Sequence, residues 1–229
     1  MLPKQFLKLP KNMQNEAVRP YFEALNKRRG TLVLKRFFDL LIAFAVLIIL
    51  SPIIVISAVL VKCTSRGPVF YLQERIGALG KPFKIIKFRT MVVDADKGSQ
   101  VTVGDDDPRI TKFGSFLRLT RIDEFPQLIN VLKGDMGMVG TRPEVKHYVD
   151  YYTDEMMATL LIRPGMVSSA SIAFRWENDM LAGAEDSERK YIDEILPAKM
   201  KYNLEYTKNV TIGKDVIVLL RTVGCIFHK

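Results

Sequence analysis

The chain has 229 residues, of which 48% are hydrophobic and 26% charged, and its formal net charge is +9. It contains only two cysteines and two histidines, which excludes a disulfide-stapled fold and a histidine-rich metal centre. No zinc-ligand spacing, helix-turn-helix pattern or aromatic RNA-binding motif accompanies the positive charge, so we predict no nucleic-acid partner.

The first 36 residues carry most of the excess positive charge. They hold nine lysines and arginines against two glutamates, which is a net charge of +7 out of +9. Near an anionic bilayer each such cation contributes about 1 kcal/mol of attraction. We therefore interpret residues 1–31 as a basic N-terminal arm that contacts membrane lipids.

Residues 40–61 form a run of 22 residues without a charge. At about 1.5 Å per residue, a helix of this length reaches roughly 33 Å, and the hydrocarbon core of a bilayer is about 30 Å thick. The pair Ser51-Pro52 interrupts the run, and an interior proline costs about 3 kcal/mol in a continuous helix. The sequence therefore predicts a membrane helix with a break or bend in its middle.

Basic residues flank this run on both sides. Lys35 and Arg36 precede it, Lys62 and Arg66 follow it, and basic flanks favour the cytoplasmic face. A helix-break-helix that enters and leaves by one leaflet would satisfy both flanks, with the freed carbonyls near the break bonded by the serine hydroxyl or by a neighbouring part of the chain. The residues alone leave two alternatives open: a straight span, and a re-entrant segment over residues 32–66.

The remaining residues, 67–229, are numerous enough for one domain with its own core. Residues 68–91 contain two apolar stretches separated by Gly77, Gly80 and Pro82, a pattern typical of a β-hairpin. Lys87 lies on the second predicted strand. It is either a solvated strand charge or a phosphate contact.

Acidic and basic residues gather in residues 107–144. Asp123 and Glu124 precede Pro126, so we predict a helix that begins near Ile122 or Asp123, continues to Lys133 and stops at Gly134. At the positive end of that helix each carboxylate gains about 0.3–1 kcal/mol and stays deprotonated at neutral pH. Asp123 would then be either a simple helix cap or part of a functional site.

The neighbours of this acidic pair favour a functional site. Arg118 and Arg121 precede it, and three glycines recur at every third residue before Arg142-Pro143. Guanidinium groups and glycines that permit close approach of a ligand are typical of a site for an anion. The segment therefore predicts an anion-binding site that also contains two carboxylates.

The C-terminal part of the chain has two stretches of mixed character. Residues 185–208 are charged with apolar residues interspersed, and residues 216–227 are apolar except for Arg221. The second stretch is too short to span a bilayer. We predict that the chain ends in interfacial amphipathic helices.

Many short motifs lie in the order seen in one known family. They are Lys35-Arg36, Phe38-Asp39, Ser51-Pro52, Gly67-Pro68-Val69-Phe70, Gln73-Glu74-Arg75-Ile76-Gly77, Lys87-Phe88-Arg89-Thr90-Met91, Asp107-Pro108-Arg109-Ile110-Thr111, Asp123-Glu124, Pro126-Gln127-Leu128, Asn130-Val131-Leu132-Lys133-Gly134-Asp135-Met136, Val139-Gly140, Arg142-Pro143 and Arg163-Pro164-Gly165. From about residue 32 onward, the chain resembles the bacterial sugar transferase family, the small monotopic phosphoglycosyl transferases.

This resemblance implies an α+β fold with a mostly helical catalytic domain, a small β-hairpin and C-terminal interfacial helices over residues 67–229. It also implies that residues 32–66 are a re-entrant membrane segment with Ser51 and Pro52 at its break. The expected location is the bacterial inner membrane, with the catalytic domain facing the cytoplasm.

The resemblance further implies that the protein transfers a sugar 1-phosphate from a UDP-sugar to polyprenyl (undecaprenyl) phosphate. The products are UMP and polyprenyl diphosphosugar, in the first membrane step of envelope polysaccharide or glycoconjugate synthesis. Asp123 is then the nucleophile that forms an aspartyl phosphosugar. Glu124 is the second catalytic residue and the ligand of a Mg²⁺ cofactor. The residues expected to hold phosphate are Arg118, Arg142, Lys87 and Arg163.

Some features depart from the family or leave alternatives open. Many members continue the Arg-Pro-Gly motif with Thr-Gly-Trp-Ala-Gln, whereas Gly165 is followed here by Met-Val-Ser-Ser-Ala, so the sugar is undetermined. A homo-oligomer is neither required nor excluded. Two rival functions also stand: a non-enzymatic membrane-surface scaffold for polysaccharide assembly, and a single-step transferase in which Asp123 acts as a base.

Overall fold

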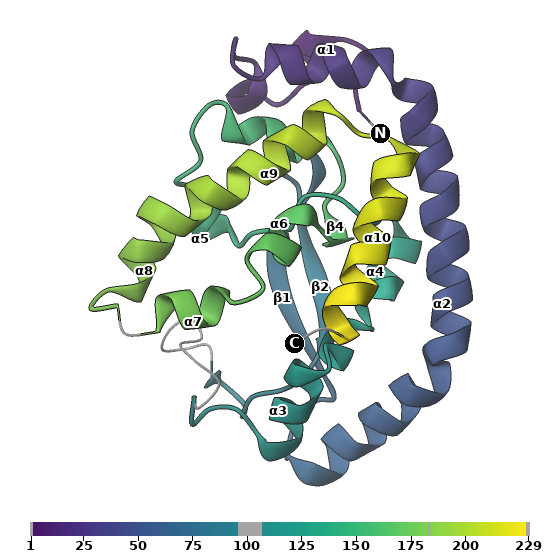
Figure 1. Cartoon of the computed structure of the whole chain (residues 1–229), viewed down its shortest axis with the longest axis vertical. Coiled ribbons are helices and arrows are strands. Elements are labelled where there is room, and N and C mark those ends of the chain that lie inside the picture. Colours follow the sequence, from purple (N-terminus) through teal and green to yellow (C-terminus); the bar gives the residue numbers. More distant parts are fainter. Residues whose placement is uncertain (1, 96–106, 183, 228–229) are drawn as a thin grey trace.

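The computed structural model describes residues 2–95, 107–182 and 184–227. The fold is mostly helical with two small sheets, which confirms the predicted α+β class. Figure 1 shows the long helix α2 along one side of the molecule, with the other elements gathered on its inner side. The helical elements are η1 (Phe6–Lys8), η2 (Lys11–Met13), α1 (Arg19–Lys27), α2 (Arg29–Thr64), η3 (Ala78–Gly80), α3 (Lys112–Leu119), η5 (Ile122–Glu124), α4 (Gln127–Lys133), α5 (Lys146–Val149), η6 (Met156–Leu161), α6 (Ser169–Ala173), α7 (Glu177–Leu181), α8 (Ser187–Lys190), η7 (Tyr191–Ile195), α9 (Leu196–Lys208) and α10 (Ile212–Phe227).

The first sheet is the predicted hairpin. Strands β1 (Phe70–Ile76) and β2 (Pro82–Phe88) are antiparallel, with Phe70 opposite Phe88 and Ile76 opposite Pro82. The turn between them contains Leu79 at a φ of 58°, a left-handed conformation that is uncommon outside glycine. The sequence predicted this hairpin correctly because glycines and a proline separate its two apolar stretches.

The second sheet was not predicted. It pairs β3 (Gly137–Val139) with β4 (Gly165–Val167) in parallel. A Cβ atom added at Gly165 would meet the Gly140 nitrogen at 2.0 Å, so the two chains approach this closely only because both residues are glycines. This contact fixes the start of the loop that carries Arg142 and the end of the segment that carries Arg163.

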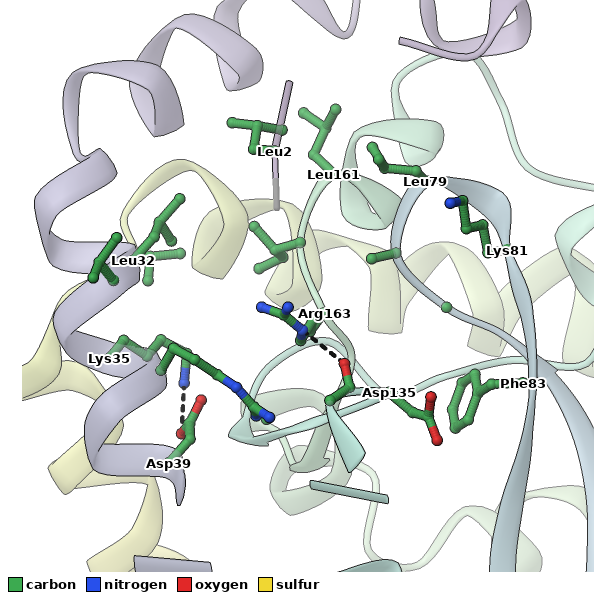
Figure 2. A pocket seen from close by; sticks show the side chains of 18 of the residues that line it. Leu2, Leu32, Lys35, Asp39, Leu79, Lys81, Phe83, Asp135, Leu161 and Arg163 are labelled. Atoms are coloured by element: carbon green, nitrogen blue, oxygen red, sulfur yellow. Dashed lines mark hydrogen bonds and ion pairs between the residues drawn. The ribbon is translucent and has the colours of Figure 1, made fainter. Parts of the chain in front are cut away.

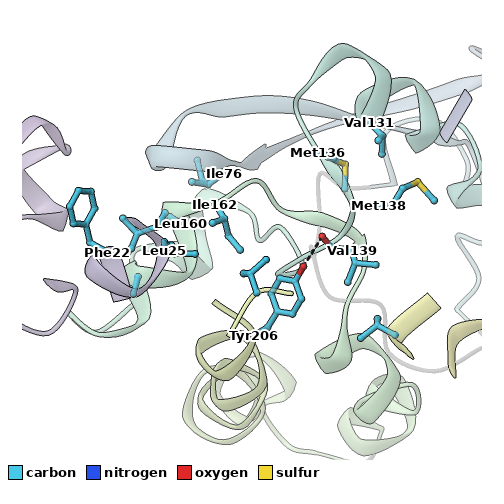
Figure 3. Close-up of a cluster of buried hydrophobic side chains, with 14 of the residues drawn as sticks. Phe22, Leu25, Ile76, Val131, Met136, Met138, Val139, Leu160, Ile162 and Tyr206 are labelled. Atoms are coloured by element: carbon cyan, nitrogen blue, oxygen red, sulfur yellow. Dashed lines mark hydrogen bonds between the residues drawn. The ribbon is translucent and has the colours of Figure 1, made fainter. Parts of the chain in front are cut away.

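The N-terminal residues belong to the main hydrophobic core. Phe22 and Leu25 of α1 are buried beside Leu160 and Ile162, and α1 also packs against α9 (Figure 3). In the same core the Tyr206 hydroxyl donates to the Val139 carbonyl at 3.2 Å. The described part of the basic N-terminal arm is therefore packed on the domain, and its contact with lipid stays a prediction.

The N-terminal half of α2 is held by polar contacts. Arg36 donates from Nη1 to the Met136 carbonyl at 3.1 Å and from Nη2 to the Val131 carbonyl at 2.9 Å. Lys35 pairs with Asp39 at 3.2 Å and with Asp215 of α10 at 2.8 Å. These bonds attach the start of α2 to α4, β3 and α10.

The C-terminal half of α2 returns to the same domain through apolar contacts. Val61 is buried with Phe88 of β2 and Leu117 of α3 in a separate small cluster. In Figure 1 the helix accordingly runs down one side of the domain and turns beneath it toward α3. Both halves of α2 are thus packed on one folded unit.

The expected break at Ser51-Pro52 is a bend within a continuous helix, because α2 continues from Arg29 to Thr64 through Pro52. Proline has no N–H to donate to the Ile48 carbonyl four residues earlier. The Ser51 hydroxyl donates to that carbonyl instead, at 2.8 Å. This confirms the predicted role of the serine. The helix is long and apolar enough to cross a membrane, and most of its apolar side chains between Val33 and Leu60 are exposed.

The C-terminal helices differ from one another. Helix α9 buries Leu196, Met200 and Tyr206, so it is largely a core helix and not an interfacial one. Helix α10 is amphipathic: Val218 is buried, whereas Val216 and Leu220 are exposed on its outer side. Only α10 therefore retains the character predicted for an interfacial helix, and its contact with a membrane remains a prediction.

Candidate active site

The acidic pair lies in a 3₁₀ turn just before α4. The Glu124 N–H donates to the Arg121 carbonyl at 3.2 Å, and the Phe125 N–H donates to the Ile122 carbonyl at 3.1 Å. The predicted start of the α-helix at Ile122 or Asp123 is therefore wrong by about one turn, and α4 begins at Gln127. Pro126 explains this difference, since it cannot donate the backbone bond that would continue one helix across both segments. The predicted end is confirmed, because Gly134 caps α4 at a φ of 98°.

Glu124 is the centre of a half-buried charge cluster. Its Oε1 atom accepts from Lys87 Nζ at 3.0 Å and from Arg142 Nη2 at 3.1 Å. Burial alone would raise the pKa of Glu124, but the charges of Lys87 and Arg142 outweigh burial and hold that pKa well below its usual range. Glu124 therefore stays ionised, and its carboxylate is the ion-pair partner of both Lys87 and Arg142.

Asp123 has a different environment although it is the next residue. It is 9% exposed, and its Oδ1 atom is buried without a hydrogen-bond partner among the described residues. The pKa of Asp123 is raised to about 6: burial and the neighbouring charge of Glu124 raise it, while Lys87, Arg121 and Arg118 oppose the increase. At neutral pH the carboxylate is still mainly ionised, and one of its oxygens has no competing donor. These are the properties required of a nucleophile.

Four elements supply the side chains of this site. Lys87 comes from β2, Arg118 from α3, and Arg142 from the loop after β3, so they are brought together by packing around the turn that holds Asp123 and Glu124. Arg163 lies elsewhere: its Nε donates to the Gly134 carbonyl at 2.7 Å, at the opposite end of α4. The structure thus gathers five of the six residues proposed for catalysis or phosphate binding.

A second buried network, which sequence reasoning missed, supports the loop of Arg142. Glu144 accepts from Lys199 at 3.2 Å and from the Tyr191 hydroxyl at 3.0 Å, and Arg75 donates to the Pro143 carbonyl at 3.2 Å. Lys199 is 3% exposed. Its spacing with Leu196, Met200 and Asn203 on one face of α9 was the signal that could have marked it as buried.

The donor set is suited to Mg²⁺ in one specific way. Among the described residues, no group of three His, Cys, Asp or Glu side chains could hold a metal by itself. Mg²⁺ is commonly bound by one or two carboxylates together with phosphate oxygens of a substrate. Glu124 and the unpartnered oxygen of Asp123 fit that arrangement.

Comparison with known proteins agrees with the motifs. The profile of the family described as bacterial sugar transferase matches residues 30–229. The UDP-N-acetylgalactosamine-undecaprenyl-phosphate N-acetylgalactosaminephosphotransferase of Aeromonas hydrophila is 34% identical over 196 residues, which cover 84% of this chain and 43% of that protein. The UDP-glucose:undecaprenyl-phosphate glucose-1-phosphate transferase of Klebsiella pneumoniae is 35% identical over 196 residues, which cover 84% of this chain and 40% of that protein.

A shorter relative matches over more of its own length. The UDP-glucose:undecaprenyl-phosphate glucose-1-phosphate transferase of Caulobacter vibrioides is 34% identical over 194 residues, which cover 82% of this chain and 68% of that protein. The chain thus spans about two fifths of the Aeromonas and Klebsiella proteins and about two thirds of this one. Because the family profile covers residues 30–229 and includes every residue of the site, this chain belongs to the bacterial sugar transferase family.

Proposed function

We propose that the protein transfers a sugar 1-phosphate from a UDP-sugar to undecaprenyl phosphate, through a covalent intermediate on Asp123. The observation that carries this proposal is the difference between the two adjacent carboxylates. Glu124 is bonded to two cations, whereas Asp123 is buried, mainly ionised at neutral pH, and has one oxygen without a partner. The names of the relatives support the same substrate classes.

In the first half-reaction, an oxygen of Asp123 attacks the phosphorus that carries the sugar. A bond forms between this oxygen and phosphorus, and the bond from phosphorus to the bridging oxygen breaks, so that UMP leaves with that oxygen. In the second half-reaction, an oxygen of the lipid phosphate attacks the same phosphorus. The bond to Asp123 then breaks and the carboxylate is restored.

In this proposal, the two arginines of the site bind the phosphates of the substrate, and the lysine adjusts the charges of the two carboxylates. Arg118 and Arg142 donate paired hydrogen bonds to phosphate oxygens, for which a planar guanidinium is better suited than an ammonium. Lys87 balances the charge of Glu124 and lowers the pKa of Asp123. Glu124 would hold a Mg²⁺ ion together with phosphate oxygens of the substrate, and that ion would supply positive charge to offset the repulsion between the anionic nucleophile and the diphosphate.

Replacing Asp123 by asparagine tests the covalent route. The substitution keeps the shape of the side chain but removes the nucleophile, so UMP release from a UDP-sugar in the absence of lipid should fall by roughly a thousandfold or more. Mass spectrometry of the unmodified protein with a panel of UDP-sugars should show the aspartyl phosphosugar and identify the sugar. Normal turnover by Asp123→Asn would refute this mechanism. A complete lack of turnover by the unmodified protein with every UDP-sugar would favour the scaffold function.

We also propose that α2 enters and leaves the bacterial inner membrane by its cytoplasmic leaflet. Support comes from the bend at Pro52, the basic flanks, and the packing of both helix halves on one domain. Single cysteines near Lys27 and near Arg66, in a chain without Cys63 and Cys225, should both be protected from a membrane-impermeant reagent added outside the cell. Labelling of one of them from outside would show that α2 spans.

A further inference from the structure

A cavity lies beside the N-terminal half of α2, away from the Asp123 site. It has a volume of about 500 Å³ and lies between α2, the hairpin turn η3 and the segment that leads into β4 (Figure 2). We call it the α2 pocket. None of the side chains that form the Asp123 site lines it. Arg163, which the family motif marks as a phosphate contact, does line it.

The α2 pocket has an excess of positive charge. Five cationic side chains line it, against the carboxylates of Asp39 and Asp135; the cations are Arg29, Lys35, Arg36, Lys81 and Arg163. The charge of Lys35 is compensated by Asp39 and Asp215. Arg36, in contrast, donates its hydrogen bonds to the neutral carbonyls of Val131 and Met136, and its guanidinium forms no direct ion pair with a carboxylate of the described residues. An anion is the ligand that complements this lining.

Two of these cations are available to a ligand. Arg163 uses its Nε for the Gly134 carbonyl, and no acceptor among the described residues bonds its two terminal nitrogens. Figure 2 shows its guanidinium directed into the pocket. The Nζ of Lys81, at the hairpin turn, also has no partner among the described residues and is exposed. A guanidinium fork together with an ammonium group is a suitable donor set for a phosphate group.

The rest of the lining is apolar and continues onto the outer surface of α2. Leu32, Leu79 and Leu161 line the pocket (Figure 2). Val33 also lines it, and this residue begins the exposed apolar stripe that continues through Phe37. A ligand with a phosphate at one end and a hydrocarbon chain at the other can therefore contact both surfaces at once.

We propose that the α2 pocket binds an anionic phospholipid, with its phosphate on Arg163 and Lys81 and an acyl chain along Val33 and Phe37. This inference rests on the proposed placement of α2 in the membrane. It assigns Arg163 to the phosphate of a bilayer lipid that is not consumed in the reaction. The bound lipid would fix α2 against the hairpin at the membrane surface.

The test uses the full chain in vesicles of phosphatidylcholine with or without phosphatidylglycerol. Native mass spectrometry after extraction should show phosphatidylglycerol retained in preference to phosphatidylcholine. Lys81→Met combined with Arg163→Met should weaken this retention by about tenfold or more, because charge-assisted hydrogen bonds are lost. Lys81→Met alone should give part of the loss, and this side chain makes no contact that the fold requires. The matched control is Arg189→Met with Lys201→Met, which removes two exposed cations outside the pocket and should retain the lipid.

Three results would overturn the inference. The first is equal retention of both lipids, and the second is equal retention of phosphatidylglycerol by the pocket and control variants. The third is saturable, Lys81-dependent binding of soluble glycerol 1-phosphate without retention of lipid, which would make this a site for a free anion. Asp123→Asn should keep the lipid while losing UMP release. Failure of the proposed reaction and failure of the lipid site are therefore separate observations.

Discussion

The two ends of α4 present similar cations to different acceptors. Before its first residue, Lys87 and Arg142 donate to the carboxylate of Glu124, so positive and negative charge are both concentrated there. At its C-terminal end, Arg36 and Arg163 donate to backbone carbonyls, which carry no net charge. At the N-terminal end, the cations shift the pKa values of Asp123 and Glu124. At the C-terminal end, the guanidinium of Arg163 keeps its positive charge available to a ligand. The acceptor, more than the type of basic residue, determines what each end can do.

The largest effect is expected from removing the acceptor that orders the first end. Glu124→Gln would leave the half-buried Lys87 and Arg142 without their counterion, so the free energy of unfolding should fall by about 1–3 kcal/mol. UMP release should fall by roughly a hundredfold or more, because the charges around the reacting phosphates are no longer organised. Denaturant unfolding and single-turnover UMP release measure the two effects. Glu188→Gln, which changes an exposed carboxylate, is the control.

A charge-preserving change separates geometry from charge at the same end. Arg142→Lys should reduce the rate of UMP release by roughly tenfold to a hundredfold, because lysine cannot reproduce a paired guanidinium contact. Arg189→Lys, at an exposed position of α8, should be without effect. If lysine at position 142 and also at Arg118 supported the normal rate, these two residues would be ordinary cations and the proposed phosphate site would be misplaced.

The ionisation of Asp123 can be measured directly. Its pKa is raised to about 6, so lowering the pH protonates the nucleophile, and UMP release should be about tenfold slower at pH 5 than at pH 7. Lys87→Met removes a charge that lowers this pKa, so the midpoint of the pH profile should move upward. A downward movement, or a flat profile across this range, would contradict the proposed role of Asp123.

The sequence was informative where a local pattern had one structural outcome. Glycines and a proline between apolar stretches predicted the hairpin, and Gly134 predicted the end of α4. It was less informative where the outcome depended on distant contacts. The β3–β4 pair has strands of three residues each, which is too short for a periodic pattern. Because residues 1–31 are rich in charge, the sequence did not indicate that Phe22 and Leu25 are core residues. Their burial depends on distant partners, namely Leu160 of η6 and Ile162 in the segment before β4.

The same contrast applies to the site. The structure brings together five of the residues that the motifs marked, although they come from different elements: Lys87, Arg118, Asp123, Glu124 and Arg142. Their roles stay predictions. The motifs did not reveal that Arg163 lies at the other end of α4, because a motif gives the order of residues and not the direction of a side chain. The support of Arg142 by Glu144 and Lys199 also depends on tertiary packing.

The smallest effect is expected at Gly134, the residue that caps the C-terminal end of α4. Gly134 has a φ of 98°, and its N–H donates to the Asn130 and Val131 carbonyls at 3.1 Å. Gly134→Ala should lower the free energy of unfolding by about 1 kcal/mol, which is a decrease of roughly 2–4 °C in Tm. Gly213→Ala is a suitable control, since an added Cβ has open space there. An unchanged Tm in Gly134→Ala would show that the left-handed conformation at this position does not require glycine.

The attachment of α2 has a consequence for the synthesis of the protein. The ribosome makes residues 29–64 before it makes α3, α4 and β3, the segments that hold the two halves of this helix. A nascent chain therefore releases its most apolar segment while the docking partners of that segment do not yet exist. With α2 in the membrane as proposed, the bilayer surface would hold this segment during the interval. The domain would then fold back onto a helix that is already in contact with lipid, so the final arrangement of α2 would be reached late in folding.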